Sequence, residues 1–302
     1  MKYEKKPLTA DEHIQLLTER GLSIQKEDRA RKYLATIGYF RLTGYMYHLQ
    51  ENDGSHQFKD GISFNDIILH YHFDKKLRAI INEYLERIEV ALRSKLTDYY
   101  CINHGFYWFT QYDLYDDKNT YDSINTEIAD RFIDPQERFL KYFKRKYTSE
   151  TLPPSNMAME ILTMGKLSRL YRGLSNDTEK ISIADDFGLP SVILSSWFIY
   201  LNNVRNICAH HGRLWNRGIT ADRPTIPKRK KYQFNGELPD DFNRSCYGVI
   251  AMIDRLLSKI NVSNRFIEKV IGLIEEYPSI NTRFMGFPSN WKEDAAWNKT
   301  SS

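Results

Sequence analysis

The stretch S-S-W-F-I-Y-L-N-N-V-R-N-I-C-A-H-H-G-R-L-W-N-R, residues 195–217, changes character halfway along. Its first half is apolar and predicts the buried part of a helix that we expect to run from Ser191 to about Leu214. Its second half, from Asn202 to Arg217, is dense in Asn, Arg and His side chains. Polar groups at this density on an otherwise buried helix are costly unless they have partners or a function. We therefore expect a functional site at the C-terminal end of this helix.

Arg205, Asn206 and His210 carry the chemistry that we expect at this site. Asn206 and His210 are at positions i and i+4, so they share a helix face, and the long side chain of Arg205 can reach the same phosphate. A histidine can donate or accept a proton near neutral pH, and an arginine can hold a phosphate and stabilise transition-state charge. An asparagine can orient either group. Together these residues suit cleavage of RNA by its own 2′-hydroxyl, a reaction that needs no metal.

His210 alone provides only half of the proton transfers in such a reaction. Either His211 assists, or a second copy of His210 comes from another subunit. His211 lies about 100° around the helix from His210, which disfavours a shared face. We therefore favour a homodimer through the motif helix, with both His210 residues at a twofold interface. A buried histidine beside a paired arginine is the ordinary structural alternative for the same residues.

Working outward, helical periodicity covers most of the chain, and no segment predicts a run of strands. Thr9 and Glu12 have capping-box spacing, and Pro135 stands at a plausible first position of a helix. The Pro153-Pro154 pair is the clearest break. Beyond the helix that starts at Thr9, we expect helices over residues 27–37, 64–100, from 121, from 135, 155–164, 165–174, 191–214, 241–260 and 263–276.

This pattern predicts an all-α protein in three segments. We expect an N-terminal helical region over residues 1–62, a helical domain over residues 63–262, and a C-terminal helix with an irregular tail over residues 263–302. Residues 216–240 form a long basic excursion with three prolines, and long loops of this kind are often functional.

The composition is that of a globular protein with a small positive charge. The 302 residues carry a formal net charge of +4, which fits a nucleic-acid partner but does not require one. Two local clusters are more basic, Lys228–Lys231 and the run between Lys141 and Lys146. Each cluster can contact phosphates, although a solvated surface is the commoner explanation of such a run. The 20 Tyr and 16 Phe residues mostly predict core packing.

Other patterns concern location and cofactors. The three cysteines are far apart, so we expect reduced thiols with neither a disulfide framework nor a metal site. Residues 1–7 are charged and have no apolar segment, so we expect no signal peptide. The longest nearly apolar run, Val192–Leu201, is too short for a membrane span, which needs about 20 residues. We expect a cytoplasmic protein that has no membrane segment and needs no cofactor.

The run R-N-I-C-A-H, residues 205–210, resembles the R-x-x-x-x-H motif of the HEPN superfamily. The longer string from Arg205 to Arg217 resembles the Abi-like abortive-infection proteins of bacteria. Three further segments resemble that family in the same order, namely I-G-Y-F-R-L-T-G-Y at 37–45, L-E-R-I-E-V-A-L-R-S at 85–94 and M-G-K-L-S-R-L-Y at 164–171.

This resemblance implies an all-α, HEPN-like helical bundle with an N-terminal helical extension. It also implies a metal-independent endoribonuclease of anti-phage defence, dimerised through the motif helix. Arg205 and His210 are then the expected catalytic pair, and Asn206 supports them. Residues that can support the pair or bind RNA are His211, Arg213, Glu86, Arg87, Glu89, Arg93, Lys228, Arg229, Lys230 and Lys231. For the four charged residues between Glu86 and Arg93, a structural ion-pair network is an equal alternative.

Three functions remain open at this point. The first is an endoribonuclease that is restrained by an antitoxin, either RNA or protein. The second is a non-catalytic module that binds a small regulatory RNA with the same basic surface. The third is an interaction protein that senses phage components, which the intact Arg205 and His210 disfavour. Segment 37–45 can contact RNA, although we favour packing of the N-terminal helices.

Overall fold

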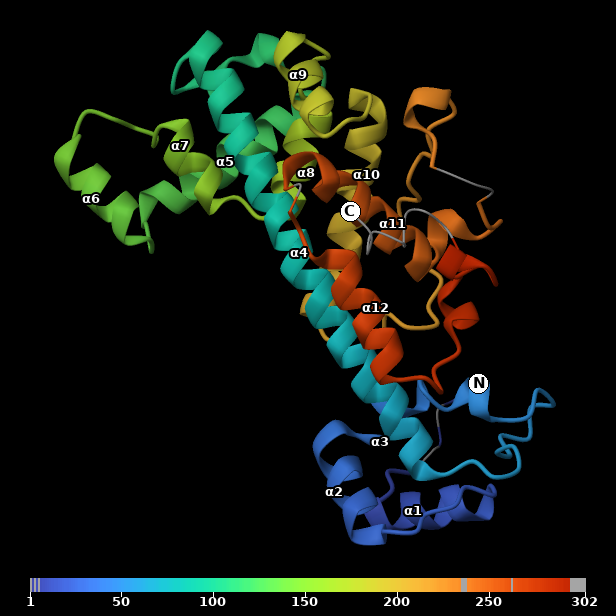
Figure 1. Cartoon of the computed structure of the whole chain (residues 1–302). Coiled ribbons are helices and arrows are strands. Elements are labelled where there is room, and N and C mark those ends of the chain that lie inside the picture. The colour runs from blue at the N-terminus through green and yellow to red at the C-terminus, as the bar shows by residue number, and fades with distance from the viewer. Residues whose placement is uncertain (1, 3, 5, 235–237, 262, 294–302) are drawn as a thin grey trace. The chain divides into compact units, whose positions relative to one another are not determined.

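The computed structural model describes all residues except 1, 3, 5, 235–237, 262 and 294–302. The described residues form helices, short 3-10 turns and three isolated bridges, and none of them forms a strand (Figure 1). The predicted all-α class is therefore confirmed.

The chain divides into two compact units. The N-terminal unit consists of residues 1–78 and 272–280, and the main unit consists of residues 79–271 and 281–302. From the sequence we expected a boundary at residue 62, before the long helix, and that boundary stays a prediction. The division between the two compact units falls inside the long helix, between Arg78 and Ala79.

The N-terminal unit contains α1 (Ala10–Glu19), α2 (Glu27–Ile37), α3 (Tyr39–Thr43) and the start of α4 (Phe64–His104). The capping box predicted at α1 is present, with the Thr9 side chain accepting from the Glu12 amide and the Glu12 carboxylate accepting from the Thr9 amide. The bounds of α2 are those predicted.

A buried polar cluster holds the segment 37–45 against α4. The Tyr45 hydroxyl donates to Asp74 Oδ2 at 2.6 Å, and Arg78 forms an ion pair with the same carboxylate. All three side chains are buried, and burial raises the pKa of Tyr45 above its ordinary value. A buried acid is tolerated only when it is paired in this way. Tyr45 therefore serves packing, whereas Phe40 in the same segment is 91% exposed.

Two histidines of the N-terminal unit are in contact. The Nε2 atoms of His48 and His70 lie 3.0 Å apart, and His70 Nδ1 lies 2.7 Å from the Asp66 carbonyl oxygen. Because a carbonyl only accepts, Nδ1 of His70 carries the proton and its Nε2 accepts when the ring is neutral. Burial lowers the pKa of His70, which fits this neutral ring.

The main unit contains the rest of α4 and eight further helices within the described residues. These are α5 (Lys118–Ile133), α6 (Arg138–Lys146), α7 (Ser155–Ala158), α8 (Met164–Gly173), α9 (Thr178–Asp186), α10 (Ser191–Ala209), α11 (Cys246–Ile260) and α12 (Phe266–Glu276), the last of which continues into the N-terminal unit. The largest side chains in the core of α10 are Trp197, Phe198 and Tyr200, none of which is exposed.

The helix bounds differ from the sequence predictions where a cap decides them. Asp117 accepts from the amides of Asn119 and Thr120, so α5 begins at Lys118, before the predicted position 121. Asp177 caps α9 in the same manner, and no helix was predicted there. The prediction that Pro135 begins a helix is wrong, because Pro135 lies in the loop before α6.

The buried histidine predicts a pH dependence of stability. The pKa of His70 is lower in the folded chain than the usual value of about 6.5, so the unfolded chain binds more protons below that pH. The free energy of unfolding should therefore fall as the pH drops below about 6.5. Urea denaturation of the full chain at pH 7.5 and pH 5.5, followed by circular dichroism, measures this loss.

His70→Gln is the matched variant, because its amide can keep a donor and an acceptor without titrating. It should show a smaller loss of stability between the two pH values than wild type. Equal losses in the two proteins would contradict the assignment to His70.

Candidate functional site

The helix that carries the predicted catalytic residues ends earlier than expected. We predicted an end near Leu214, but α10 ends at Ala209 and His210 is its C-cap. The His210 amide still donates to the Asn206 carbonyl at 3.0 Å, so His210 keeps its helical register with Asn206.

A Schellman motif terminates α10. The Gly212 amide donates to the Ile207 carbonyl at 2.8 Å, and the His211 amide donates to the Cys208 carbonyl at 3.1 Å. This motif requires a left-handed residue, and His211 has φ 57°. Glycine usually occupies that position, and histidine is one of the few other types that tolerate it. His211 therefore reverses the chain directly after His210.

The reversal forms a hollow of about 430 Å³ beside the end of α10, which we call the motif hollow. Its lining residues come from α10 and from the segment that follows, namely Asn203, Asn206, Ile207, His210, Gly212, Arg217, Gly218, Ile219, Thr220 and Ala221. Asn206 and His210 thus meet in one hollow, as expected for positions i and i+4.

Arg205 lies beside this hollow but does not line it. Its Nη1 atom donates to Asn206 Oδ1 at 3.4 Å, and its side chain is half-buried. Asn206 therefore links the guanidinium of Arg205 to the hollow that contains His210. The three predicted catalytic residues form one cluster, with Asn206 at its centre.

The imidazole of His210 is exposed and makes no hydrogen bond within the described part of the chain. A histidine with a structural role usually has partners that fix its ring, so this imidazole is available to a ligand. The buried alternative considered from the sequence, a core histidine beside a paired arginine, does not describe His210.

Arg217 was not among the predicted site residues, yet it lines the motif hollow with His210. Its Nη1 atom lies 3.5 Å from the Arg213 carbonyl oxygen, and its side chain is exposed. The sequence signal is its position at the end of the polar string 201–217. Only the reversal at His211 brings Arg217 back to the helix, and spacing along a helix does not predict that reversal.

Unusual backbone conformations gather around the motif hollow. Four non-glycine residues of the described chain have positive φ, and three of them, His211, Asn216 and Asp222, lie between residues 211 and 222. Such conformations are unfavourable for most residues and concentrate at functional sites. Asn, Asp and His are the types that adopt them at least cost.

The remaining predicted residues near the motif have other surroundings. Arg213 donates to the carbonyls of Trp215 and Asn216 at 3.0 and 2.6 Å, so it orders the turn after α10. His211 and Arg213 are not among the residues that line the hollow. Lys228, Arg229, Lys230 and Lys231 are exposed and also lie outside it.

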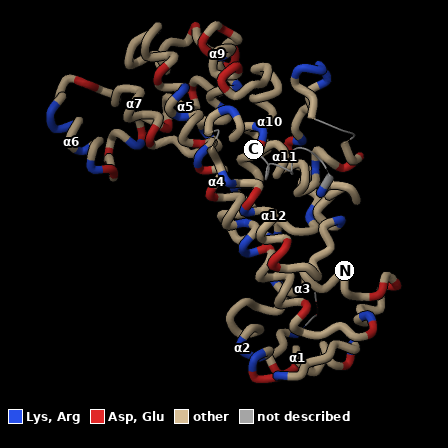
Figure 2. The backbone as a smooth tube through the Cα atoms, viewed as in Figure 1, with Lys and Arg blue, Asp and Glu red and all other residues tan. Residues whose placement is uncertain are grey.

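Basic and acidic residues are interspersed along much of the backbone (Figure 2). The longest basic stretch in a helix is at the end of α6, where Lys144, Arg145 and Lys146 occupy the last turn.

The charged residues of α4 that we predicted as supporting residues mostly form structural contacts. Arg93 forms an ion pair with Glu89 at 3.0 Å and donates to the carbonyls of Met159 and Leu162. The two charged side chains are only 15% and 14% exposed. Arg93 therefore holds the segment around residues 159–162 against α4, and its described contacts do not reach the motif hollow.

Arg87 and Glu86 lie about two turns before Arg93 on α4. Arg87 pairs with Glu83 at 3.1 Å and stacks over the Tyr84 ring, and Lys269 binds the same glutamate at 2.8 Å. Glu86 is exposed. The ion-pair alternative weighed from the sequence describes Glu89, Arg93 and Arg87.

The segment 164–171 explains how α10 is positioned. Gly165 on α8 faces Asn202, and a Cβ at this position would lie 3.3 Å from the Asn202 amide. Ser168 donates to the carbonyl of Phe198 at 3.2 Å. A glycine and a small hydroxyl residue thus allow α8 to approach α10 closely.

Three further findings bear on cofactors and location. Within the described residues, no three His, Cys, Asp or Glu side chains are grouped so that they can hold a metal ion. The three cysteines are free. A search of the described helices finds none with the length and apolar character that crossing a bilayer requires.

The left-handed conformation of His211 predicts opposite effects for two substitutions. His211→Gly should leave the free energy of unfolding unchanged or raise it by up to about 1 kcal/mol, because glycine adopts φ > 0 without steric cost. His211→Val should lower it by ~1–2 kcal/mol, because a β-branched residue is strained there. Urea denaturation measures both, and a loss for the glycine variant as large as for valine would contradict the assigned turn.

The chain was also compared with known proteins. The family model described as Abi-like protein matches residues 32–216, which is more than half of the chain and includes Arg205, Asn206 and His210. No curated protein and no solved structure matches. The match includes the three segments at 37–45, 85–94 and 164–171 and the fourth as far as Asn216, and the chain therefore belongs to the Abi-like proteins.

Proposed function

We propose that this protein is a HEPN-type endoribonuclease of bacterial abortive-infection defence. One observation carries the proposal most directly. An exposed imidazole without a hydrogen bond in the described chain, that of His210, shares a hollow with Asn206 and Arg217. Membership of the Abi-like family supports the role in defence.

The proposed reaction is attack of a ribose 2′-hydroxyl on the adjacent phosphate. His210 removes the 2′-hydroxyl proton, the 2′-oxygen bonds to phosphorus, and the bond to the 5′-oxygen breaks. A protonated histidine gives that 5′-oxygen its proton. The products are a 2′,3′-cyclic phosphate and a 5′-hydroxyl end. Arg205 and Arg217 stabilise the charge on the phosphate oxygens, and Asn206 orients the phosphate or Arg205.

The second histidine is proposed to be His210 of another copy of the chain. His211 is the alternative, but it does not line the motif hollow and its backbone is committed to the turn. Because His210 is exposed at the helix end, a twofold arrangement of two chains can place both imidazoles at one phosphate.

Two further parts of the proposal concern an antitoxin and the need for a metal. A nuclease that damages its own cell must be restrained, so we include an antitoxin among the partners of this protein. The reaction uses proton transfer and arginine contacts, so we propose that it proceeds without a metal ion.

Substitution of His210 tests the chemistry. In a bacterial host that expresses wild type, total RNA should gain new 5′-hydroxyl ends, whereas His210→Ala should give none because the proton transfer is lost. His211→Gly is the matched control, because it removes the neighbouring imidazole and keeps the turn. It should keep the cleavage pattern of wild type.

Purified wild type should also cut RNA in the presence of EDTA. New ends with His210→Ala would remove His210 from the chemistry. RNA that co-purifies with wild type, with no cleavage by any variant, would instead favour a non-catalytic RNA-binding module.

Mixed dimers test the shared site. Wild type and His210→Ala are co-expressed with different tags, and the mixed species is purified through both tags. It should cut RNA at least about tenfold more slowly than wild type, because a composite site then lacks one of its two histidines. A mixed species of wild type and His211→Gly should keep its activity. Half of the wild-type rate in the His210→Ala mixture would show that each chain acts alone.

A further inference from the structure

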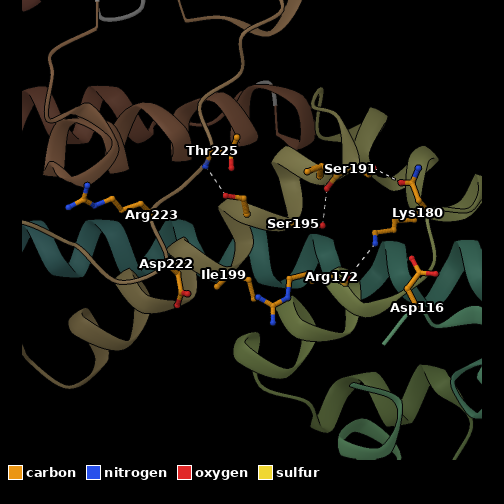
Figure 3. A pocket seen from close by; sticks show the side chains of 12 residues that line it. Asp116, Arg172, Lys180, Ser191, Ser195, Ile199, Asp222, Arg223 and Thr225 are labelled. Atoms are coloured by element: carbon orange, nitrogen blue, oxygen red, sulfur yellow. Dashed lines mark hydrogen bonds between the residues drawn. The ribbon is translucent and has the colours of Figure 1, made fainter. Parts of the chain in front are cut away.

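A second hollow lies on α10 nearer to the start of the helix, and we call it the upstream hollow. Its volume is about 450 Å³. Its lining residues are Asp116, Arg172, Asn176, Lys180, Ser191, Val192, Ser195, Ser196, Ile199, Asp222, Arg223 and Thr225 (Figure 3). Neither the sequence nor the family match assigned a role to this set.

The two hollows lie on one face of α10. The lining residues on α10 include a series that is spaced alternately by four and three positions. Residues with this spacing share one face of a helix. The series consists of Val192, Ser196 and Ile199 in the upstream hollow and Asn203, Asn206 and His210 in the motif hollow.

The segment after α10 runs back along the same face and forms the opposite wall of both hollows. The Thr225 amide donates to Ser196 Oγ at 2.7 Å, and Asn203 donates to Asp222 at 3.0 Å. Residues 217–221 line the motif hollow, and residues 222, 223 and 225 line the upstream one. The hollows are therefore consecutive, and the hydrogen bond between Asn203 and Asp222 joins a lining residue of one to a lining residue of the other.

The upstream hollow presents two exposed arginines. The guanidiniums of Arg172 and Arg223 are exposed and have no hydrogen bond or ion pair within the described chain. Figure 3 shows the Arg172 side chain between Lys180 and Asp222. Arginine donors of this kind suit a phosphate, which they can bind with two parallel hydrogen bonds.

The other charged residues of the upstream hollow already have partners. Lys180 donates to the carbonyl of Arg172 at 3.0 Å, so it caps the end of α8, and burial lowers its pKa. Asp116 accepts from Ser175 at 2.8 Å, and Asp222 accepts from Asn203. The donors that remain for a ligand are thus mainly those of the two arginines.

Apolar and carboxylate groups complete a lining that suits a nucleotide better than phosphate alone. Val192 is 73% exposed at the rim, and Ile199 is half-buried. Apolar side chains of this kind can contact a base, while a carboxylate such as that of Asp222 can accept from a ribose hydroxyl. RNA combines these three chemical groups in each of its units.

We propose that the upstream hollow binds a nucleotide of the same RNA strand that is cut at His210, with its phosphate on Arg172 and Arg223. Ile199, which lines the upstream hollow, and His210 are ~16 Å apart along α10, so the bound nucleotide and the cleaved phosphate belong to different units of the strand. This inference rests on the proposed nuclease function. It specifies the substrate as single-stranded RNA that lies along α10, because both hollows are on one narrow face of the helix.

Binding is tested in His210→Ala protein, which keeps RNA uncut. Fluorescence anisotropy measures the affinity for a single-stranded RNA of about eight nucleotides. Adding Arg172→Gln and Arg223→Gln together should weaken binding at least about tenfold, and the slope of log affinity against log salt should fall by about 0.7, because the two arginines share one phosphate. Arg265→Gln is the control for loss of one exposed arginine, and it should change neither quantity.

A variant that binds RNA more tightly excludes misfolding as the reason for a change in RNA affinity. Asp222→Asn removes a negative charge from the wall between the hollows, and asparagine also tolerates the φ of 47° at this position. Asparagine keeps an oxygen that can accept from a ribose hydroxyl, so this variant should bind the same RNA more tightly, which a misfolded protein would not do.

Cleavage separates this inference from the proposed function. Wild type should have a higher kcat/KM for the eight-nucleotide RNA than for a dinucleotide, and the Arg172→Gln, Arg223→Gln variant should lose most of that preference. If wild type cuts RNA and the preference survives both substitutions, the upstream hollow does not bind the strand and the nuclease stands. If wild type cuts neither RNA, the proposed function fails together with this inference.

A free nucleotide is the rival occupant of the upstream hollow. Isothermal titration with adenosine monophosphate distinguishes the two. The proposed strand site would be overturned by one outcome: the two arginine substitutions abolish binding of the mononucleotide but leave the affinity for RNA unchanged.

Discussion

Burial of the apolar half of α10 is the constraint on which the rest of the candidate site depends. Trp197, Phe198 and Leu201 are fully buried, and the approach of α8 at Gly165 fixes the side of the helix that they occupy. A helix is rigid, so fixing one half also fixes the direction of every side chain in the other half. The face with Asn206 and His210 is the one left to line a hollow.

The segment after α10 depends on the same helix. It reverses at His211 and returns beside the helix that it has just left, where Trp197 donates to the Thr225 carbonyl at 2.9 Å. One helix face and one returning segment thereby form both hollows. Both the proposed nuclease site and the proposed strand site rest on this arrangement.

The commitment of polar groups separates structural residues from candidate functional ones. Three cationic side chains donate hydrogen bonds to backbone carbonyls, namely Arg93, Arg213 and Lys180. Each of them thereby fixes a turn or a helix end. Buried carbonyls without donors would be costly, so these three cations have a structural reason to be present. The exposed imidazole of His210 and the exposed guanidinium of Arg172 have no such commitment within the described chain.

The sequence by itself determined the all-α class, the bounds of α2 and the common face of Asn206 and His210, because helical periodicity and capping are local properties. Only the tertiary structure decided the end of α10, the return of Arg217, the structural partners of Arg93 and the upstream hollow. Each of these depends on contacts between residues far apart in the chain, or on a left-handed turn at His211 that histidine adopts only in a suitable environment. Local periodicity carries no information about which distant segments meet.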